Sequence, residues 1–488
     1  MVKSVLIIGA GIAGLSTGCY AQRNGYRSEI FEMHTVPGGV CTAWKRQGYT
    51  FDGCIHHLAG TQPSSALYRI WHELGALPRP MVYPEELVTL EAPGGQRVTL
   101  YYDSERLEDH LKSIAPADAP AIEDYVRGIR AFDGFDLLDA PYAGLSYNLK
   151  ALTRLPRLLK WFKMPMAGLA RHFHTPVLSR VMPFAQYNSV DTPVALHLNM
   201  LQQCGQQRYG WPAGGSLKFA LDIAHHYESL GGTLHYRSPV DKILVEDGRA
   251  VGLRLADGTQ RRGDVVVSTA YGHTTIFDML DGRYTSRAIR SYYGNPVDRI
   301  DLGLLISLGV NRDLSGEPHA LILLLDEPAS IAGQVRDRLK LSLYGHDPGM
   351  APNGHGSITV SLETSYRYWA DLHQDPERYH EAKEQVAAIV VCLLEARFPG
   401  LAQQLDVVDV ATPATTERYT GNRHGFQAGF GSMLGGLLTG NGLSKTLPGL
   451  ENFYMAGQWA NVPGLPGVAA MGRDVVRTLC KKDGKRFL

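Results

Sequence analysis

Val5-Leu6-Ile7-Ile8-Gly9-Ala10-Gly11-Ile12-Ala13-Gly14 is the stretch that decides the fold of this chain. Its apolar first half predicts a strand buried on both faces, as in a parallel sheet. A glycine turn follows, and then an expected helix over Leu15–Asn24. A second apolar strand, over Arg27–Phe31, stops at Glu32. Strand, glycine turn, helix, second strand and terminal acid together predict a Rossmann unit that binds a dinucleotide.

Each position of the glycine motif has a physical task. Gly9 makes the tight turn, Gly11 lets the backbone approach a pyrophosphate, and Gly14 lets the helix pack against the strand. The helix N-terminus favours the negative charge of the pyrophosphate. Glu32, 18 residues after Gly14, suits hydrogen bonds from ribose hydroxyls and repels a 2′-phosphate. The cofactor contacts predicted here are Gly9, Gly11, Ile12, Ala13, Gly14, Glu32 and Met33.

Composition excludes several classes of protein. The 488 residues suggest two or three domain-sized units, and 48 basic residues against 48 acidic ones give no global charge that favours nucleic acid. The six cysteines form no CxxC pair, so we expect no metal site and a reducing cytoplasm. No stretch reaches the ~18 apolar residues of a membrane span. The first apolar run is also too short for a secretory signal.

The residues after Glu32 bear on the choice between NAD and FAD. The pair Gly38-Gly39 suits a loop that passes close under an extended cofactor, because no Cβ stands in the way. We therefore predict contacts at Gly38, Gly39 and Val40. An ordinary turn followed by a hairpin over Gly48–Gly53 is the alternative.

Glu32, the Gly38-Gly39 pair and Tyr49-Thr50-Phe51-Asp52 together resemble the phytoene desaturase, carotenoid isomerase and retinol saturase group of flavoproteins. That group belongs with the amine-oxidase-like flavoenzymes, and the resemblance implies a non-covalently bound FAD. This chain has Val40 and Cys41 where the group usually has Arg or Ser. Cys41 is a candidate for covalent flavin attachment or for a redox thiol, although a buried, inert cysteine is the expectation.

The resemblance implies two further cofactor segments. In the first, a helix over Ser216–Leu230 and strands near 233–236, 240–243, 250–255 and 265–269 form an α/β series. Backbone at Val240 would there meet the adenine. In the second, the strand Phe453–Gly457 and the turn Gly464–Gly467 precede a final helix, whose N-terminus would stabilise negative charge on the reduced flavin. Gln458 stands where many related flavoproteins have an acidic residue. The contacts implied at this end are Gly457, Gln458, Gly467 and Val468.

These segments predict an α/β fold in which a discontinuous Rossmann-type FAD-binding domain carries an inserted α+β substrate domain. The FAD-binding domain would comprise residues 1–60, 210–285 and 415–488, and the substrate domain residues 61–209 and 286–414. Expected elements of the substrate domain are helices over 66–74 and 377–397 and strands over 302–310, 321–325 and 357–363. No second glycine motif is present, so the electron donor or acceptor stays open.

Five residues are candidates for contact with the reacting groups. His56 and His57 lie where the chain is expected to leave the flavin, and one suits an acid or base. Neighbours on an extended chain point to opposite faces, so at most one faces the cofactor, and a structural role is the commoner outcome. The resemblance implies that Arg418 and Tyr419 lie on a strand that borders the flavin's re face or entrance, and contacts within the fold are the alternative. Trp459 and Tyr419 are candidates for an aromatic cage.

Residues 152–173 interleave basic and apolar side chains, a pattern that suits an anionic membrane surface. Pro156 and Pro165 limit any helix there to about nine residues. A helix that covers a substrate tunnel, with its basic face solvated, is the alternative. We expect a cytoplasmic protein, with the membrane surface as a second location.

The function predicted is hydride transfer between flavin N5 and a carbon of a hydrophobic small molecule, such as a polyene or another prenyl-derived lipid. The protein would exclude water and hold the substrate against the flavin. A saturating reductase or a redox-neutral isomerase on the same scaffold is one alternative. A flavin amine oxidase and a non-catalytic flavin-binding accessory protein are the others.

Overall fold

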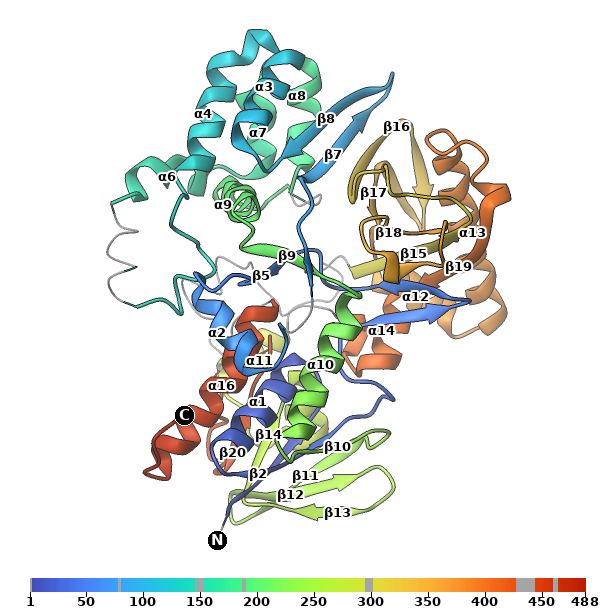
Figure 1. Cartoon of the computed structure of the whole chain (residues 1–488). Helices are drawn as coiled ribbons and strands as arrows, with labels where there is room; N and C mark the ends of the chain where they lie inside the picture. The colour runs from blue at the N-terminus through green and yellow to red at the C-terminus, as the bar shows by residue number, and fades with distance from the viewer. Residues whose placement is uncertain are drawn as a thin grey trace.

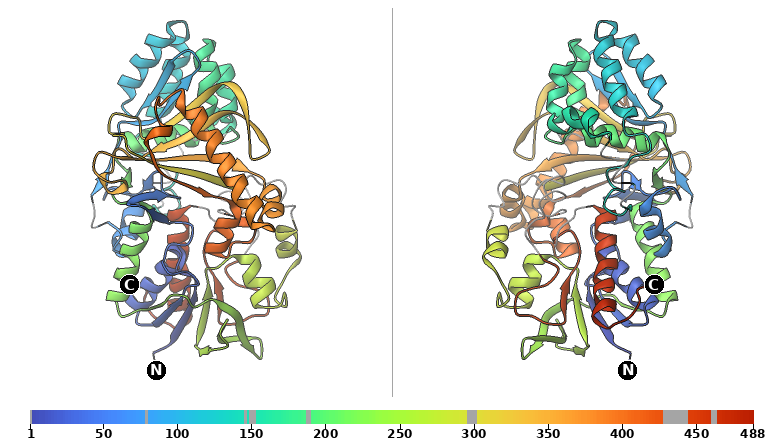
Figure 2. Two further views of the ribbon diagram at one scale, coloured as in Figure 1. Left: turned by 90° about the vertical axis from the view of Figure 1, so that its right-hand side faces the viewer. Right: turned by 90° about the vertical axis from the view of Figure 1, so that its left-hand side faces the viewer.

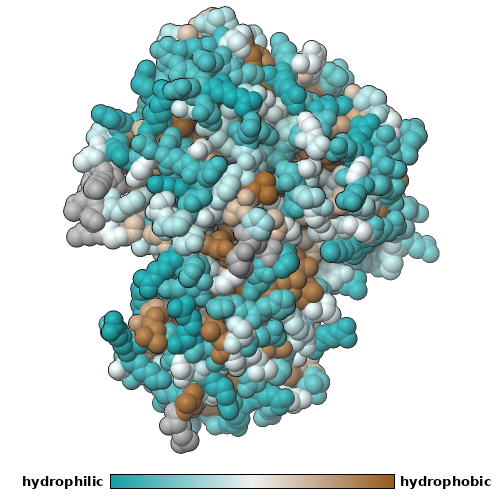
Figure 3. Space-filling view, in the orientation of Figure 1, coloured by the Kyte–Doolittle hydropathy of each residue, from teal (hydrophilic) through white to brown (hydrophobic). Residues whose placement is uncertain are grey.

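The computed structural model describes residues 2–77, 80–144, 147, 153–186, 190–294, 302–426, 444–459 and 464–488. A parallel sheet with its helices occupies one end of the molecule, and a larger mixed sheet with a helical layer occupies the other (Figure 1). Hydrophilic residues dominate the surface in Figure 3, and hydrophobic ones gather near the waist between the two ends.

The parallel sheet is the predicted Rossmann sheet, with strand order β10-β2-β1-β14-β20. Its strands are β1 (Ser4–Ile8), β2 (Arg27–Phe31), β10 (Thr233–His235), β14 (Val265–Ser268) and β20 (Phe453–Met455). Every residue of β1 and of β14 is buried, as their unbroken apolar runs predict. The α/β fold class is confirmed, and one sheet unites strands from three distant parts of the chain.

Three helices cover one side of this sheet: α1 (Ile12–Arg23), α10 (Gly215–Ser229) and α16 (Leu465–Lys482). On the opposite side lies an antiparallel sheet of β11 (Val240–Glu246), β12 (Arg249–Leu255) and β13 (Gln260–Arg262) (Figure 2). The predicted start of the first helix at Leu15 was wrong. Gly11 is already the extended N-cap residue, so the helix begins directly after it.

The mixed sheet has seven strands in the order β19-β15-β18-β17-β16-β7-β8. They are β7 (Glu86–Ala92), β8 (Gln96–Tyr101), β15 (Leu302–Val310), β16 (Ala320–Ile331), β17 (Gln334–Leu343), β18 (Gly356–Thr364) and β19 (Leu405–Ala411). The strands expected at 302–310, 321–325 and 357–363 are present within β15, β16 and β18. The sequence reading had not included β17.

Helices surround the mixed sheet and join it to the parallel one (Figure 1). They are α2 (Ala66–Glu73), α3 (Ser104–Ile114), α4 (Ala119–Arg130), α6 (Leu155–Lys163), α7 (Leu169–His172), α8 (Pro176–Val181), α9 (Val194–Gly205), α11 (Arg287–Tyr293), α12 (Tyr366–His373), α13 (Pro376–Glu395) and α14 (Pro413–Thr420). Shorter strands are β3 (Ala43–Arg46), β4 (Tyr49–Asp52), β5 (Leu58–Ala59), β6 (Met81–Val82) and β9 (Tyr209–Pro212). Within the described ranges, no helix has both the length and the apolar character that crossing a bilayer requires.

The strand expected around Arg418 and Tyr419 is in fact helix α14, so that prediction was wrong. Thr412 and Thr415 exchange hydrogen bonds in a capping box that starts the helix, and Pro413 occupies its first turn. Gly421 ends it in the left-handed conformation that glycine adopts without strain. These local signals outweigh the strand that the resemblance implied.

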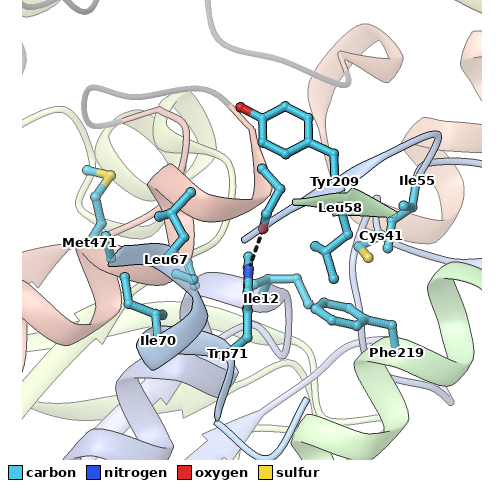
Figure 4. Close-up of a cluster of buried hydrophobic side chains, with 14 of the residues drawn as sticks. Ile12, Cys41, Ile55, Leu58, Leu67, Ile70, Trp71, Tyr209, Phe219 and Met471 are labelled. Carbon is cyan, nitrogen blue, oxygen red and sulfur yellow. Dashed lines mark hydrogen bonds between the residues drawn. The ribbon is translucent and has the colours of Figure 1, made fainter. Parts of the chain in front are cut away.

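A buried apolar cluster lies at the junction of the two ends (Figure 4). Ile12 of α1, Trp71 of α2, Phe219 of α10 and Met471 of α16 meet there, and all are nearly or fully buried. The indole nitrogen of Trp71 donates to the Ala59 carbonyl at 2.7 Å. The helix that follows the glycine motif is thus fixed from three directions by packing.

Candidate functional site

Two glycines of the first loop have different roles: Gly14 is required for packing of the helix on the strand, whereas Gly11 leaves space for a ligand. A Cβ built on Gly14 would lie 2.0 Å from the carbonyl oxygen of Gly9, so only glycine permits this approach of helix to strand. A Cβ on Gly11 would meet nothing nearer than the Gly38 carbonyl oxygen at 3.9 Å. The space beside Gly11 therefore lies open at the N-terminus of α1, where an anion is favoured.

Glu32 ties this loop to the end of β2. Its Oε2 accepts from the amide of Ala10 at 2.7 Å, and its Oε1 accepts from the amide of His34 at 2.8 Å. Burial raises the pKa of this carboxyl, while the two amide donors act in the opposite direction. Each carboxylate oxygen has two acceptor sites, so Glu32 retains capacity for ribose hydroxyls.

The second glycine loop lies against the first. The Gly38 amide donates to the Ala10 carbonyl at 2.9 Å, and Gly11 and Gly38 form an isolated parallel bridge. A Cβ on Gly39 would lie 3.5 Å from the Cα of Gly11. Hence the Gly38-Gly39 pair, singled out in the sequence, borders the open space beside Gly11. The hairpin of β3 and β4 follows it, as the alternative interpretation of this stretch expected.

A groove of about 430 Å³ continues from these loops. We call it the dinucleotide groove; Glu32, His34, Gly39, Val40 and Tyr419 are among its lining residues. The Tyr419 ring stands edge-on to His34, with 5.0 Å between ring centroids. The Met33 side chain is 42% exposed beside it, and Arg418 lies on the same helix as Tyr419. A groove of this volume suits a nucleotide.

A second cavity of about 610 Å³ lies between the dinucleotide groove and the seven-stranded sheet. We call it the sheet cavity; its lining includes Asp52, His56, Arg336, Arg338, Lys340 and Tyr344. Val40, Gly53 and Leu305 line both cavities, so the two meet at these residues. A ligand in one is therefore within reach of a ligand in the other.

Asp52 stabilises the part of the sheet cavity that adjoins the dinucleotide groove. Its carboxylate accepts from the Ser216 amide and hydroxyl, both at 2.6 Å, and from the Cys54 amide at 3.0 Å. Burial raises the pKa of Asp52 to about 6, although these donors oppose the shift. Gly215, at φ +74°, would bring a Cβ to 2.4 Å from this carboxylate. The sequence predicts no role for Asp52, because its partner Ser216 lies far along the chain.

The two adjacent histidines occupy different surroundings. His56 lines the sheet cavity, whereas a ring nitrogen of His57 lies 2.6 Å from the hydroxyl of Tyr102. Burial lowers the pKa of His56 to about 3, and it lowers that of His57 well below its usual value. Both rings are therefore neutral near pH 7. Of the two, His56 is the one placed to offer a neutral imidazole to a molecule in the sheet cavity.

The carboxyl-terminal candidates lie around the same glycine loop. Gly457, at φ +107°, follows β20, and a Cβ there would lie 3.8 Å from that of Ala13. Gln458 comes next, and Gly467 and Val468 belong to the first turn of α16. Val240 is the half-buried first residue of β11.

Trp459 belongs to a different aromatic cluster from Tyr419. Its ring packs edge-on against Tyr271, with 4.5 Å between centroids, and Phe426 completes that cluster. Tyr419 instead contacts His34. The two rings proposed for an aromatic cage thus belong to separate clusters.

Cys41 is buried in the apolar cluster shown in Figure 4. The hydrogen bond with the neighbouring Cys54, together with burial, holds the pKa of its thiol well above the usual value. A thiol of this kind is a poor nucleophile at neutral pH. In the part of the chain that the structure describes, no three His, Cys, Asp or Glu side chains are grouped to hold a metal ion.

Three basic residues in the sheet cavity were missed: Arg336, Arg338 and Lys340 of β17. Their signal was present in the sequence as an alternation of basic residues with Leu339, Leu341 and Leu343. Such a period of two predicts a strand with one polar face. Burial lowers the pKa of Lys340 to about 8.

The Rossmann sheet, the paired glycine loops and the groove beside them define a dinucleotide-binding protein with an oxidoreductase fold. A family model described as an NAD(P)-binding Rossmann-like domain matches residues 7–74. Among solved structures, an oxidoreductase from Methanosarcina mazei is 17% identical with a TM-score of 0.58, and the match covers 97% of this chain and 100% of that one. A triple mutant of putrescine oxidase is 13% identical with a TM-score of 0.61, over 98% and 99%.

Curated relatives match over most of the length. The all-trans-retinol 13,14-reductase of Danio rerio is 22% identical, over 95% of this chain and 83% of its own. The prolycopene isomerase of Arabidopsis thaliana is 25% identical, over 85% and 72%. A lycopene-forming phytoene desaturase from a Paracoccus species is 24% identical, over 98% and 97%. The chain is thus similar over most of its length to a retinol reductase, a prolycopene isomerase and a phytoene desaturase, so the resemblance noted in the sequence is confirmed.

Proposed function

We propose that this protein is an FAD-dependent oxidoreductase that acts on a carbon–carbon bond of a hydrophobic substrate. The observation that carries the proposal is the meeting of the dinucleotide groove with the sheet cavity at Val40, Gly53 and Leu305. FAD would occupy the groove and the substrate the cavity. When bound, the flavin accepts or donates a hydride at N5.

The residues present fit this cofactor. The open space beside Gly11 would take the pyrophosphate against the amides of Ile12 and Ala13, at the start of α1. Glu32 would accept from the ribose hydroxyls, and Gly38-Gly39 would leave room for the chain of the cofactor. The first turn of α16, with Gly467 and Val468, would stabilise negative charge on the flavin ring. Val240, Gly457 and Gln458 are further proposed contacts.

On the substrate side, the protein's part is to hold the reacting bond and to exclude water. His56 is the proposed proton carrier, because its neutral ring lines the sheet cavity. His57 would position it through the contact with Tyr102. We propose that residues 61–209 and 286–414 form the substrate domain, and that residues 1–60, 210–285 and 415–488 form the FAD-binding domain.

The relatives' names favour a polyene or another prenyl-derived lipid as the substrate class, and they include a desaturase, an isomerase and a reductase. An amine oxidase is a weaker candidate, because Trp459 and Tyr419 contact different aromatic partners. A flavin-binding accessory protein without turnover stays an alternative. It would bind FAD but show no bleaching of the flavin with any donor.

The test is an absorption spectrum of the purified protein, followed by acid precipitation and chromatography of the released pigment. We expect a flavin spectrum and free FAD in the supernatant. A pellet that stays yellow would show covalent attachment and would make Cys41 the first candidate ligand. A colourless protein that binds NADH would overturn the assignment of FAD.

We further propose that α6 touches a membrane surface. Leu155 and Leu159, one helical turn apart, are 44% and 46% exposed, while Leu158 and Trp161 anchor the helix in the core. The basic residues around them are Arg154, Arg157, Lys160 and Lys163. Exposed leucines among basic residues suit an anionic interface. Lys160 also pairs with Asp124, so part of this charge is already engaged.

Replacing Leu155 and Leu159 together by aspartate is expected to lower binding to phosphatidylserine vesicles by roughly tenfold or more, because two apolar contacts are lost and two repulsive charges are added. Vesicle sedimentation measures the bound fraction. Val2→Asp, which changes an exposed apolar residue elsewhere, serves as the control. Equal sedimentation of all three proteins would contradict the membrane proposal.

A further inference from the structure

Histidine rings from three segments of the chain gather beside the sheet cavity. His57 and His346 each stand edge-on to His319, with 5.7 and 5.8 Å between ring centroids. His56, the neighbour of His57, lines a second space together with His319 and His346. We call this space, of about 20 Å³, the small cavity. Since His56 lines the sheet cavity as well, its ring adjoins both spaces.

Strand pairing brings His319 to this place. His319 directly precedes β16, whose Ala320 pairs with Ser342 of β17. Ser342 lines both the sheet cavity and the small cavity. On its other edge, β16 runs parallel to β7, which begins at Glu86 (Figure 1). The register therefore places His319 next to the small cavity on one side and next to Glu86 on the other.

Glu86 orients the His319 ring. Its Oε1 lies 3.3 Å from Nδ1 of His319 and accepts from the backbone amide of His319 at 3.4 Å. Burial alone would raise the pKa of Glu86, but the hydrogen bond and the charge of His319 outweigh it and hold the pKa below its usual value. An ionised carboxylate only accepts hydrogen bonds. In a neutral His319 ring, Nδ1 therefore carries the proton and Nε2 presents a lone pair.

The small cavity has the properties of a water site. Nε2 of His319 and Nδ1 of His346 are buried, and neither has a hydrogen-bond partner within the described part of the chain. Buried polar atoms of this kind are ordinarily satisfied by water. Roughly 10–15 Å³ of space is enough for one water molecule, so the small cavity can hold one. In a space of this size, a single water lies against His56, His319 and His346 alike.

The outer end of this cluster reaches solvent. The side chains of His319 and Glu86 are 11% and 18% exposed. Burial lowers the pKa of His346 to about 4 and that of His56 to about 3, so both rings are neutral near pH 7. A neutral imidazole can accept a proton at one nitrogen while it releases another from the second nitrogen. A proton can therefore pass through His56 without a lasting charge on its ring.

We propose that His56, one buried water and His319 form a proton path between the sheet cavity and solvent, with Glu86 at its outer end. The path rests on the proposed function, in which His56 exchanges a proton with the substrate. His56 takes up a proton at one nitrogen and releases one from the other to the water. The water passes a proton to Nε2 of His319, which releases its Nδ1 proton toward Glu86 and solvent.

Each of these transfers breaks one N–H or O–H bond and forms another, so the path consumes no oxidant or reductant. The reverse order delivers a proton from solvent to the substrate. His319 acts through His56 and does not touch the substrate, which makes it a positioning residue. The path would serve desaturation, isomerisation and saturation alike, because each of these reactions moves a proton at carbon.

Two measurements on the purified full-length protein test the path without a substrate. A crystal structure that resolves ordered water is expected to show one molecule about 2.7–3.2 Å from both His319 Nε2 and His346 Nδ1. Nitrogen-15 NMR of histidine-labelled protein, at a pH where the ring is neutral, is expected to show the His319 proton on Nδ1. The variant His319→Gln assigns the signal. A small cavity without water, or a proton on Nε2, would overturn the path.

A kinetic measurement tests the flow of protons. All-trans-retinol is the polyene probe for the dithionite-reduced holoprotein, and the loss of polyene absorbance gives the rate. His319→Gln is expected to lower this rate at least roughly tenfold and to leave the dissociation constant of retinol within about twofold, because an amide cannot take up and release a proton. The ratio of the rates in H₂O and D₂O should rise, since proton transfer becomes the slower step. A purely structural role of His319 would leave this ratio unchanged.

His380→Gln is the matched control, because His380 forms a similar pair with Glu384 at 3.1 Å on the exposed face of α13. This variant is expected to keep the wild-type rate and the wild-type isotope ratio. Added imidazole should restore part of the rate of a His319→Ala variant. Thermal melting checks that the variants fold. A wild-type rate in folded His319→Gln protein would contradict the path.

The flavin content of the same preparation separates this inference from the proposed function. A protein that binds no FAD contradicts the proposed function, while the water and the His319 tautomer still decide whether the path exists. They also decide it where retinol is not converted. A flavin-containing protein whose small cavity holds no water contradicts only the path.

Discussion

A Gly11→Val variant is expected to fold like the wild type and to retain the proposed flavin at a level at least roughly tenfold lower. Gly11 has φ −66° and ψ 172°, which a residue with a side chain adopts without strain. Its Cβ would meet only the Gly38 carbonyl oxygen, at 3.9 Å. The added methyl groups would instead fill the space proposed for the pyrophosphate, and the helix N-terminus would lose its ligand. The ratio of flavin absorbance to protein absorbance measures the effect.

Gly14→Ala is the matched comparison. The added Cβ would lie 2.0 Å from the Gly9 carbonyl oxygen, so α1 must move away from β1. We expect this variant to lose both stability and flavin, with a melting temperature several degrees below wild type. A fully flavinated Gly11→Val protein would contradict the assignment of the glycine loop. If both variants lost stability, the glycine loop would affect flavin binding only through its effect on folding.

Asp52→Ala is expected to lower the free energy of unfolding by about 3 to 5 kcal/mol. The substitution leaves the Ser216 amide, the Ser216 hydroxyl and the Cys54 amide without their acceptor in a buried place. Each buried donor without a partner costs about 1 to 3 kcal/mol, and water entering the space recovers part of it. Urea unfolding followed by circular dichroism measures the change.

Asp371→Ala, on an exposed position of α12, is the control and should change the unfolding free energy by less than about 0.5 kcal/mol. A similarly small effect at Asp52 would mean that its hydrogen bonds contribute nothing to holding β4 against α10.

The Asp52→Asn variant tests the electrostatic part of this contact. Because burial raises the folded-state pKa of Asp52 from 3.8 to about 6, the native state binds a proton between those values that the unfolded chain releases. This group therefore contributes stability at low pH, and that contribution is lost as the pH rises from about 4 to 6. The shift corresponds to about 3 kcal/mol. Subtracting the variant's pH profile from that of the wild type should reveal a fall of that order; parallel profiles would contradict the raised pKa.

The dinucleotide-binding unit was predictable because its information is local. Glycine spacing, an apolar strand on each side and a terminal acid require only near neighbours to interpret, and the structure places Gly11, Glu32 and Gly38 within one hydrogen-bonded loop system. The strand that was predicted from the resemblance, without such local signals, was wrong. The capping box at Thr412 and the left-handed Gly421 make a helix of the segment that carries Arg418 and Tyr419.

The sequence by itself determined the Rossmann class, the position of the two glycine loops and the resemblance to the relatives, because short-range patterns encode all three. Only the tertiary structure decided which distant side chains meet. It brought Ser216 to Asp52, divided His56 from His57, and assigned Trp459 and Tyr419 to separate clusters. It also turned Arg336, Arg338 and Lys340 toward a cavity that meets the dinucleotide groove. The physical reason is that strand pairing brings together residues hundreds of positions apart. The sequence around each of these residues does not indicate which residue it will pair with.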